Sequence, residues 1–567
     1  MSTATTATPA TPSQSGTLGL GLLVALVIGS IVGSGIFGLP QNMASSAGAG
    51  AILIGWIITG IGMLTLARVY QMLALQKPDL NNGVYAYARA LAGEYVGFNS
   101  AWGYWVSAWI GNVGYLVAAF GALGYFFPVF GEGNTPAAVL GASMVVWLVH
   151  ALVLRGIQGA TVLNAVVTVA KMAPLLLFIV LVALAFQVQT FTVDFWGTPA
   201  LGSVLDQVKS TMLITVWVFI GIEGASVYSA RAKNRADVGR ATLIGFGICL
   251  ALLMAVSLLS LGIFAQPELA GLKNPSMASV LEKAVGTWGA VLIYLGLMVS
   301  VGGGFLAWTL LAAESLFTPA DGGVMPTWLA RQNAQKVPAN ALWLTNGMVQ
   351  IFLLITLFSK ASYLALISLS TAMILVPYLF SAVYGLKVAW DGKQSRGVRS
   401  SKAVAVTQPP AFGRADLAIA ALASVYCLWL LYAAGLKYLL LAALLYAPGA
   451  VLYIVAKRQR SQTAFTGGEW LLLALLVVLA GVAGYLLSAG QLKLCCAAGL
   501  NFYCTLLNPI QPYSTLLNPC SNQERFLDQD FIPRDLLGSR CAAQSAGVPP
   551  RLGSDAPDTG QLRILAV

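Results

Sequence analysis

Four ionisable side chains lie inside long apolar stretches of this sequence: Lys171, Glu223, Glu314 and His150. A charged group at the centre of a bilayer costs about 3 kcal/mol or more, so such residues are candidates for ion or substrate pathways. Lys171 occurs in "VTVAKMAPLLLFIV" and Glu223 in "VFIGIEGASVYS". Within a membrane, each could act as a titrating group or as a counter-charge for a bound ion or substrate.

Each of these residues also has a purely structural interpretation. Lys171 could snorkel to the membrane surface or pair with a neighbouring carbonyl, and Glu314 lies close enough to a helix end to reach the interface. His150, the only histidine in the chain, is more typical of a packed or hydrogen-bonded helix residue than of a proton relay. Glu223 differs, because it lies in the glycine-interrupted segment 221–226, where a regular helix is not expected.

Glycine-rich interruptions occur twice inside apolar stretches. The first is "SIVGSGIF", residues 30–37, and the second is "GIEGAS", residues 221–226. Non-helical backbone at membrane depth is tolerated only where it lines a cavity or is buried in protein. Because the first interruption falls in the first apolar span and the second in the sixth, their spacing predicts two inverted repeats of five spans with a binding site between the breaks.

The helix ends exposed by these breaks are chemically complementary. After residues 33–35 a half-helix begins, and its free N–H groups favour a carboxylate. Before Gly221 a half-helix ends, and its orphan carbonyls, from about Trp217 to Ile220, favour an ammonium group. A carboxylate site that faces an ammonium site predicts a receptor for α-amino acids.

The elements that must position these groups are membrane helices. Of the 567 residues, 58% are hydrophobic and 9% are charged, whereas a soluble domain carries about 25% charged residues. Apolar stretches of the roughly 20 residues that a bilayer core requires recur along the chain. Thirteen spans are predicted, at residues 18–39, 49–75, 98–128, 136–154, 160–187, 210–230, 241–265, 287–318, 341–359, 362–386, 416–434, 437–456 and 469–489.

Positive charge is distributed unequally between the two sides of these spans. With a cytoplasmic N-terminus, nineteen Lys and Arg residues fall in cytoplasmic segments and five in the opposite loops, in accordance with the positive-inside rule. The first sixteen residues contain no Lys or Arg, unlike a cleavable signal peptide, so the first helix is predicted to be retained. The net charge of +11 therefore reflects topology and not a nucleic-acid surface.

Aromatic side chains on other spans could select the side chain of the substrate. Four are available at suitable depth: Trp308, Tyr104, Trp109 and Tyr378. An aromatic face binds a desolvated guanidinium with about 1 to 2 kcal/mol. Aromatic residues are also common in helix cores and interfacial belts, so the composition alone supplies some of them.

Five motifs occur in an order and spacing that resemble one family of transporters: "GSIVGSGIF", "YWVSAWIGN", "VWVFIGIEGASVYSARAKN", "WTLLAAE" and "VPANALWLTNG". Over roughly residues 15–490 the chain resembles the basic amino acid/polyamine antiporters of the amino acid–polyamine–organocation superfamily. This resemblance implies an all-α polytopic membrane protein with a 5+5 inverted-repeat (LeuT-like) transporter core and about 13 transmembrane helices. It also implies exchange of basic amino acids across the bacterial cytoplasmic (inner) membrane, with arginine entering as ornithine leaves.

The resemblance further implies a set of site residues. The substrate carboxylate is expected at Ser34 and Gly35, and its ammonium at the carbonyls of Ile31, Trp217 and Ile220. The positions that touch or stack on the substrate side chain are matched by Asn112, Trp308 and Ser370. The gating positions are matched by Tyr104, Trp217, Glu223 and Tyr378.

Two departures from the family pattern bear on coupling and selectivity. Lys171 stands where some members have an uncharged residue, whereas related proton-coupled permeases carry a lysine there. Its ammonium is expected to bridge the first and eighth spans, in place of the sodium ion of sodium-coupled members. Tyr115 and Ser107, on either side of Asn112, are expected to reshape the side-chain pocket.

Strict exchange requires a carrier that cannot change its facing when empty, so the substrate must stabilise the occluded state. Arginine and ornithine each carry one net positive charge near neutral pH, so their exchange is expected to be electroneutral. Glu223 is expected either to supply a negative field for the cationic side chain or to latch the gate.

Rival functions make different demands on the sequence. In a proton-coupled lysine or arginine permease, Lys171 and Glu223 would be the titrating groups. A membrane-embedded enzyme would need clustered nucleophiles, acids or metal ligands, yet the chain has one His, and five of its seven Cys follow residue 490. A transport-derived sensor would need a signalling domain, and the short loops contain none that is recognisable.

The chain is predicted to divide into five segments: a disordered cytoplasmic N-terminus at 1–16, a ten-span core at 17–388, a basic cytoplasmic linker at 389–415, three further spans at 416–490 and an atypical tail at 491–567. The tail has five Cys and a doubled "TLLNP". It is predicted to be disordered or the product of an altered reading frame, although disulfides could form in it outside the cytoplasm.

The expected partners are arginine, ornithine, lysine and membrane lipid, with a homodimer implied by the resemblance; no cofactor, metal or nucleic acid is expected.

Overall fold

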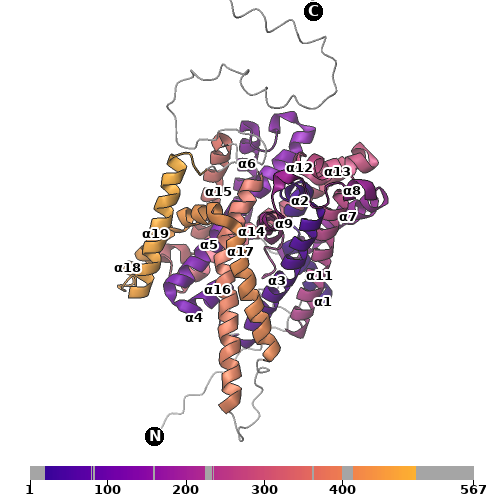
Figure 1. Ribbon diagram of the computed structural model, residues 1–567. Helices are drawn as coiled ribbons and strands as arrows, with labels where there is room; N and C mark the ends of the chain where they lie inside the picture. Colours follow the sequence, from indigo (N-terminus) through magenta and orange to yellow (C-terminus); the bar gives the residue numbers. More distant parts are fainter. Residues whose placement is uncertain are drawn as a thin grey trace, which may run out of the picture. The chain divides into compact units, whose positions relative to one another are not determined.

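The computed structural model is built from α-helices and short 3₁₀ turns in the part of the chain that it describes, namely residues 19–77, 80, 83–156, 160–223, 233, 235–359, 363–398 and 413–492 (Figure 1). The predicted N-terminal segment 1–16, most of the predicted linker and nearly all of the predicted tail lie outside these residues.

The first five predicted spans correspond to one pair of helices and four single helices. They are α1 (Leu20–Ile31) with α2 (Gly35–Ala44), α3 (Ala49–Gln76), α5 (Glu94–Phe126), α6 (Pro136–Leu154) and α7 (Ala160–Leu184). The first two form a single broken span with a bend of 48°. Shorter elements connect the spans: α4 (Gly83–Ala92), η1 (Pro128–Phe130), α8 (Val188–Thr192) and η2 (Pro199–Leu201).

The next five spans correspond to α9 (Val204–Trp217), α11 (Arg235–Ser260), α14 (Thr287–Asp321), α15 (Ala339–Ser359) and α16 (Tyr363–Val398). Their connections contain α12 (Gln266–Ala270), α13 (Ser276–Val285) and η4 (Thr327–Ala330). The sixth span is described only through α9 and the turns at 218–223. Helix α16 continues to Val398, past residue 388, where the sequence predicts that the core ends.

The last spans are formed by α17 (Arg414–Tyr446), α18 (Gly449–Gln459) and α19 (Gly467–Ser488). Gly435, with φ of 73°, breaks α17 where the sequence predicts the boundary between spans eleven and twelve. Among the described helices, ten are long and apolar enough to cross a membrane, or eleven when α1 and α2 count as one span. The prediction of about thirteen spans is consistent with this number. The number counts α17 and α18 together as one helix, although two spans are predicted there, and it leaves out the sixth span, which extends beyond the described residues.

Helices that are five spans apart in the sequence have equivalent neighbours in the fold. Helix α1 packs on α11 and α7, and its counterpart α9 packs on α3 and α16. Likewise α5 packs on α16, and its counterpart α14 packs on α7. The connecting helices α4 and α13 follow corresponding spans but lie at opposite ends of the bundle (Figure 1). This arrangement is the inverted repeat that the two glycine breaks predict.

The basic segments gather at one end of the bundle, which we call the inner end. There Arg89 pairs with Glu94 at 2.6 Å, and Lys457 bonds to the same carboxylate. The opposite, outer end carries the pair Lys273 and Glu132 at 3.0 Å. The segments that the charge pattern assigns to one side of the membrane are therefore joined to one another in space.

Candidate functional site

The first break is a non-helical segment, residues 32–34, and backbone carbonyls in and just before it accept hydrogen bonds from donors on other helices. Lys171 of α7 donates through Nζ to the Gly29 carbonyl at 3.0 Å and also to the Val32 carbonyl. Ser300 of α14 donates through Oγ to the Gly33 carbonyl at 3.2 Å. Because its carbonyls are bonded from the side, the break is stable at membrane depth.

Lys171 is only 1% exposed, and its ammonium points into the protein. The interpretation that it snorkels to the membrane surface is therefore wrong, and pairing with backbone carbonyls is what the structure shows. Its bonds in the described part of the chain go to the first span alone. The described contact of that break with the eighth span is made instead by Ser300.

The second break follows α9 and touches the first break directly. Gly221 adopts φ of 109°, a left-handed conformation that glycine tolerates better than other residues. The Ser30 hydroxyl donates to the Gly221 carbonyl at 3.1 Å, and a Cβ added at Gly221 would lie 2.6 Å from the Ser30 carbonyl oxygen. The backbone turns upstream, where the Ile220 N–H donates to the Trp217 carbonyl at 3.2 Å. The Trp217 carbonyl expected to be an orphan therefore already accepts one bond.

Glu223 connects the second break to two tyrosines on other helices. Tyr104 of α5 donates to one carboxylate oxygen and Tyr378 of α16 to the other, both at 2.8 Å. The Gly221 N–H also lies 3.3 Å from the carboxylate. Three of the four predicted gating residues, Tyr104, Glu223 and Tyr378, thus meet in one buried cluster, which joins spans three, six and ten.

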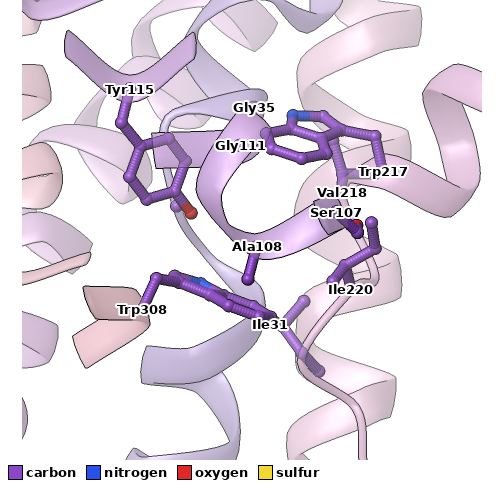
Figure 2. Close-up of a pocket in the computed structure, with 11 residues that line it drawn as sticks. Ile31, Gly35, Ser107, Ala108, Gly111, Tyr115, Trp217, Val218, Ile220 and Trp308 are labelled. Atoms are coloured by element: carbon purple, nitrogen blue, oxygen red, sulfur yellow. The ribbon is translucent and has the colours of Figure 1, made fainter. Parts of the chain in front are cut away.

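A cavity lies between the two breaks (Figure 2). It is lined by Ile31, Gly33, Gly35, Ser107, Ala108, Gly111, Tyr115, Trp217, Val218, Ile220 and Trp308. In Figure 2 the rings of Trp217 and Trp308 lie on different sides of this space, and the Tyr115 hydroxyl points into it. A Cβ added at Gly35 would lie 2.8 Å from the Trp217 indole nitrogen, so Gly35 is needed for this close approach.

Five of the eight predicted substrate-binding residues line this cavity: Ile31, Gly35, Trp217, Ile220 and Trp308. The other three are not among the residues that line it. Ser34 bonds through Oγ to the Tyr363 hydroxyl at 3.1 Å, Asn112 donates to Thr309 Oγ1 at 3.2 Å, and Ser370 donates to the Ser107 carbonyl at 2.7 Å. The Asn112 Oδ1 atom is buried and finds no hydrogen-bond partner among the described residues.

Trp109 was a candidate for contacting the substrate, and the structure places it elsewhere. Its ring packs against Phe352 of α15 with centroids 4.5 Å apart and against Trp105 at 6.0 Å. Tyr104 by contrast lies near the cavity, since its ring is 6.3 Å from that of Trp308. Trp109 is therefore a packing residue between α5 and α15.

Sequence reasoning missed Ala108, Gly111, Val218 and Tyr363. The first two belong to a stripe on α5 that begins at Tyr104 and recurs every three or four residues to Tyr115, so helical spacing alone could have identified them. Tyr363 begins α16 and contacts the first break only through the fold. No local pattern marks it.

A second, larger cavity extends toward the outer end. Its lining includes Leu213 and Ile214 of α9, one turn before Trp217, together with Lys209 and Lys437. Trp217 thus lies between this outer vestibule and the central cavity. On the other side of the central cavity lies the hydrogen-bonded cluster around Glu223.

The other ionisable candidates lie away from this cavity. His150 contacts Asn346 at 3.1 Å and packs against Trp343 with ring centroids 4.2 Å apart, so it joins α6 to α15. Glu314 is exposed and accepts from Thr318 at 3.3 Å. Within the described residues, no group of three or more His, Cys, Asp and Glu side chains could hold a metal ion.

Comparisons with known proteins agree with this architecture. A family model of amino acid permeases matches residues 18–480. The chain is 54% identical over 485 residues to the arginine/ornithine antiporter of Pseudomonas aeruginosa. These aligned residues cover 84% of this chain and 98% of the relative. It is 44% identical over 487 residues to the L-lysine transport protein of Corynebacterium glutamicum (85% and 97%) and 42% identical over 487 residues to the arginine/agmatine antiporter of Chlamydia caviae (84% and 98%).

Proposed function

The chain belongs to the amino acid permease family, and from this premise we propose that it exchanges basic amino acids, arginine inward for ornithine outward, across the bacterial cytoplasmic membrane. The observation that carries the proposal is the cavity between two broken helices, with a half-helix N-terminus on one side and an aromatic face on the other. The 54% identity to an arginine/ornithine antiporter over nearly its whole length supports this choice of substrates.

The backbone of the cavity suits the α-amino acid group. The first N–H groups of α2, at Ser34 and Gly35, would hold the carboxylate, because a helix N-terminus carries partial positive charge. The carbonyls of Ile31, Trp217 and Ile220 would accept from the ammonium. A carbonyl oxygen has two lone pairs, so the turn bond already made to Trp217 leaves capacity for a substrate N–H.

The side-chain end of the substrate would lie against Trp308. Its indole lines the cavity, and a guanidinium on an aromatic face gains about 1 to 2 kcal/mol when water is excluded. Asn112 would accept from the cationic group through the Oδ1 atom that has no partner in the described structure, after a small shift of the cavity wall. Ser370 would support the same wall from α16.

Alternating access would use two unlike gates. Trp217 would close the site toward the outer vestibule, because its ring lines the cavity and packs closely against Gly35. Tyr104, Glu223 and Tyr378 would close it toward the inner end through their shared hydrogen bonds. Exchange without net uptake follows if only the loaded carrier can change its facing, because binding energy must then stabilise the occluded state.

The orientation and coupling form part of the same proposal. The inner end would face the cytoplasm, together with the N-terminus, because the basic segments gather there. Lys171 would act as a fixed cation that holds the first break in place of a coupling ion. The protein would function as a homodimer in lipid, as its family resemblance implies, with no cofactor.

Exchange in proteoliposomes tests this proposal. The purified protein is reconstituted, the vesicles are loaded with ornithine, and labelled arginine is added outside. We expect rapid uptake that requires internal ornithine and is insensitive to an imposed pH gradient. Accumulation in empty vesicles driven by the pH gradient would instead establish a proton-coupled lysine or arginine permease, the alternative that the buried Lys171 and the lysine-transporting relative favour.

A further inference from the structure

Two phenolic hydroxyls from different helices converge on the first break. Tyr363, at the start of α16, lies with its hydroxyl 3.1 Å from Ser34 Oγ. Tyr115, on α5, brings its hydroxyl to the same break, at Gly33. Both side chains are buried, at 7% and 6% exposure. The N-terminal end of α2 is therefore surrounded by hydroxyl groups, in addition to its own N–H groups.

Tyr115 is the one of the two that lines the cavity. A Cβ added at Gly33 would lie 2.1 Å from its hydroxyl oxygen, so this glycine makes room for the phenol. Its ring meets Trp217 edge to face with centroids 6.1 Å apart. Figure 2 shows that hydroxyl pointing into the space between the two indoles.

Tyr115 is expected to reshape the side-chain end of the pocket, and its position also brings its hydroxyl close to the first break. Asn112, one turn earlier on α5, bonds to Thr309 of α14 and is not among the residues that line the cavity. The Tyr115 hydroxyl faces Gly33, beside the half-helix N-terminus where the substrate carboxylate is proposed to bind. The two residues are close in sequence but contact different parts of the site.

A hydroxyl can accept one hydrogen bond while it donates another, and an ionised carboxylate only accepts. A phenol that accepts from a half-helix N–H can therefore donate its proton to a carboxylate bound beside the same N–H groups. Such charge-assisted bonds are roughly twice as strong as neutral ones. A site built around them rejects an analogue that lacks the carboxylate, because its buried donors are left unpaired.

We propose that the Tyr115 hydroxyl is a specificity-determining donor to the α-carboxylate, and that Tyr363 orients the Ser34 hydroxyl for the same group. This inference rests on the proposed function and deepens it, since it assigns the carrier to substrates that keep their carboxylate. Decarboxylated amines, which offer only cationic ends, are the class that these hydroxyls disfavour.

The test measures binding of arginine and of agmatine, which is arginine without its carboxylate, to purified protein by isothermal titration calorimetry. In the wild type we expect arginine to bind at least about tenfold more tightly. Tyr115→Phe should weaken arginine binding about tenfold and leave agmatine binding unchanged, so that the preference disappears. Tyr363→Phe should shift the preference in the same direction by about threefold. Tyr125→Phe, an exposed change on the same helix, is the control and should change neither value.

The outcomes separate this inference from the function on which it rests. Equal losses for arginine and agmatine in Tyr115→Phe would show that the phenol supports the cavity or the side-chain end, and unchanged binding of both would show that it makes no bond to substrate. Either result overturns the inference. A wild-type protein that binds neither compound would overturn the proposed function itself.

Discussion

The two broken helices are stabilised in opposite ways. At the first break, the carbonyls of Gly29, Val32 and Gly33 accept from Lys171 and Ser300, which belong to other helices. At the second break, the charge belongs to the broken segment itself, and Glu223 accepts from tyrosines of α5 and α16. The first break is thus fixed by bonds to backbone atoms, whereas the second is joined to its neighbours through side-chain hydroxyls.

This difference predicts different roles for the two breaks in transport. Among the described residues, the bonds of this buried cation go only to carbonyls, so we expect them to persist while the helices around it move. A carboxylate held by two phenols can release either one at the cost of a single hydrogen bond, about 1 kcal/mol net. We therefore expect the first break to hold its shape through the transport cycle and the second break to change its contacts.

Lys171→Met should have the largest effect. It removes the donor to two buried carbonyls, and each unsatisfied carbonyl costs about 1 to 3 kcal/mol. We expect arginine–ornithine exchange in proteoliposomes to fall roughly 100-fold. Lys283→Met, a change of a solvent-exposed lysine, serves as the control and should exchange normally. Wild-type exchange by Lys171→Met would show that the first break does not depend on this cation.

Gly221→Ala should rank second. A Cβ at φ of 109° is strained, and here it would also lie 2.6 Å from the Ser30 carbonyl, where the two breaks touch. Strain of this kind costs about 1 to 3 kcal/mol, so we expect roughly a 30-fold loss of exchange and a lower melting temperature of the purified protein. Gly302→Ala, which meets no atom within 4 Å, should stay within about twofold of wild type. A tolerated Gly221→Ala would mean that the breaks can separate freely.

Trp308→Leu should weaken substrate binding without disturbing either break. The indole lines the cavity from α14, and loss of a desolvated cation–π contact of about 1 to 2 kcal/mol predicts roughly a tenfold weaker arginine affinity. Fold and membrane insertion should be preserved, as judged by size-exclusion chromatography. Trp288→Leu, an exposed change on the same helix, provides the comparison. Unchanged affinity would remove Trp308 from the binding site.

Much of the architecture could be predicted because membrane helices carry their own signals. The glycines at 33–35 and 221–224 interrupt apolar stretches, and a lysine or glutamate in such a stretch is conspicuous at any depth. The helical spacing from Tyr104 to Tyr115 places one face of α5 on the cavity. These are local features of the sequence, so they can be recognised without knowledge of the tertiary packing.

Contacts between distant helices could not be predicted in the same way. Lys171 was expected to reach the eighth span, yet its described bonds go to the first, and only the packing of α7 against α1 determines that. Tyr363 looks like any aromatic residue at a helix start until the fold brings it to Ser34. Trp109 and Trp308 are equally plausible in sequence, and the rotation of each helix decides which one faces the cavity.

The smallest expected effect decides how the second break works. Glu223 is not among the residues that line the central cavity, and both of its carboxylate oxygens accept from tyrosines, which favours a latch over a direct field on the substrate. Tyr378→Phe keeps the charge and removes one bond, whereas Glu223→Gln removes the charge and disturbs the same bonds. For a latch, both variants should slow exchange about threefold and leave arginine affinity unchanged. Weaker arginine binding in Glu223→Gln alone would assign the carboxylate to the substrate field, and the second break would then be a charged wall of the binding site instead of a gate.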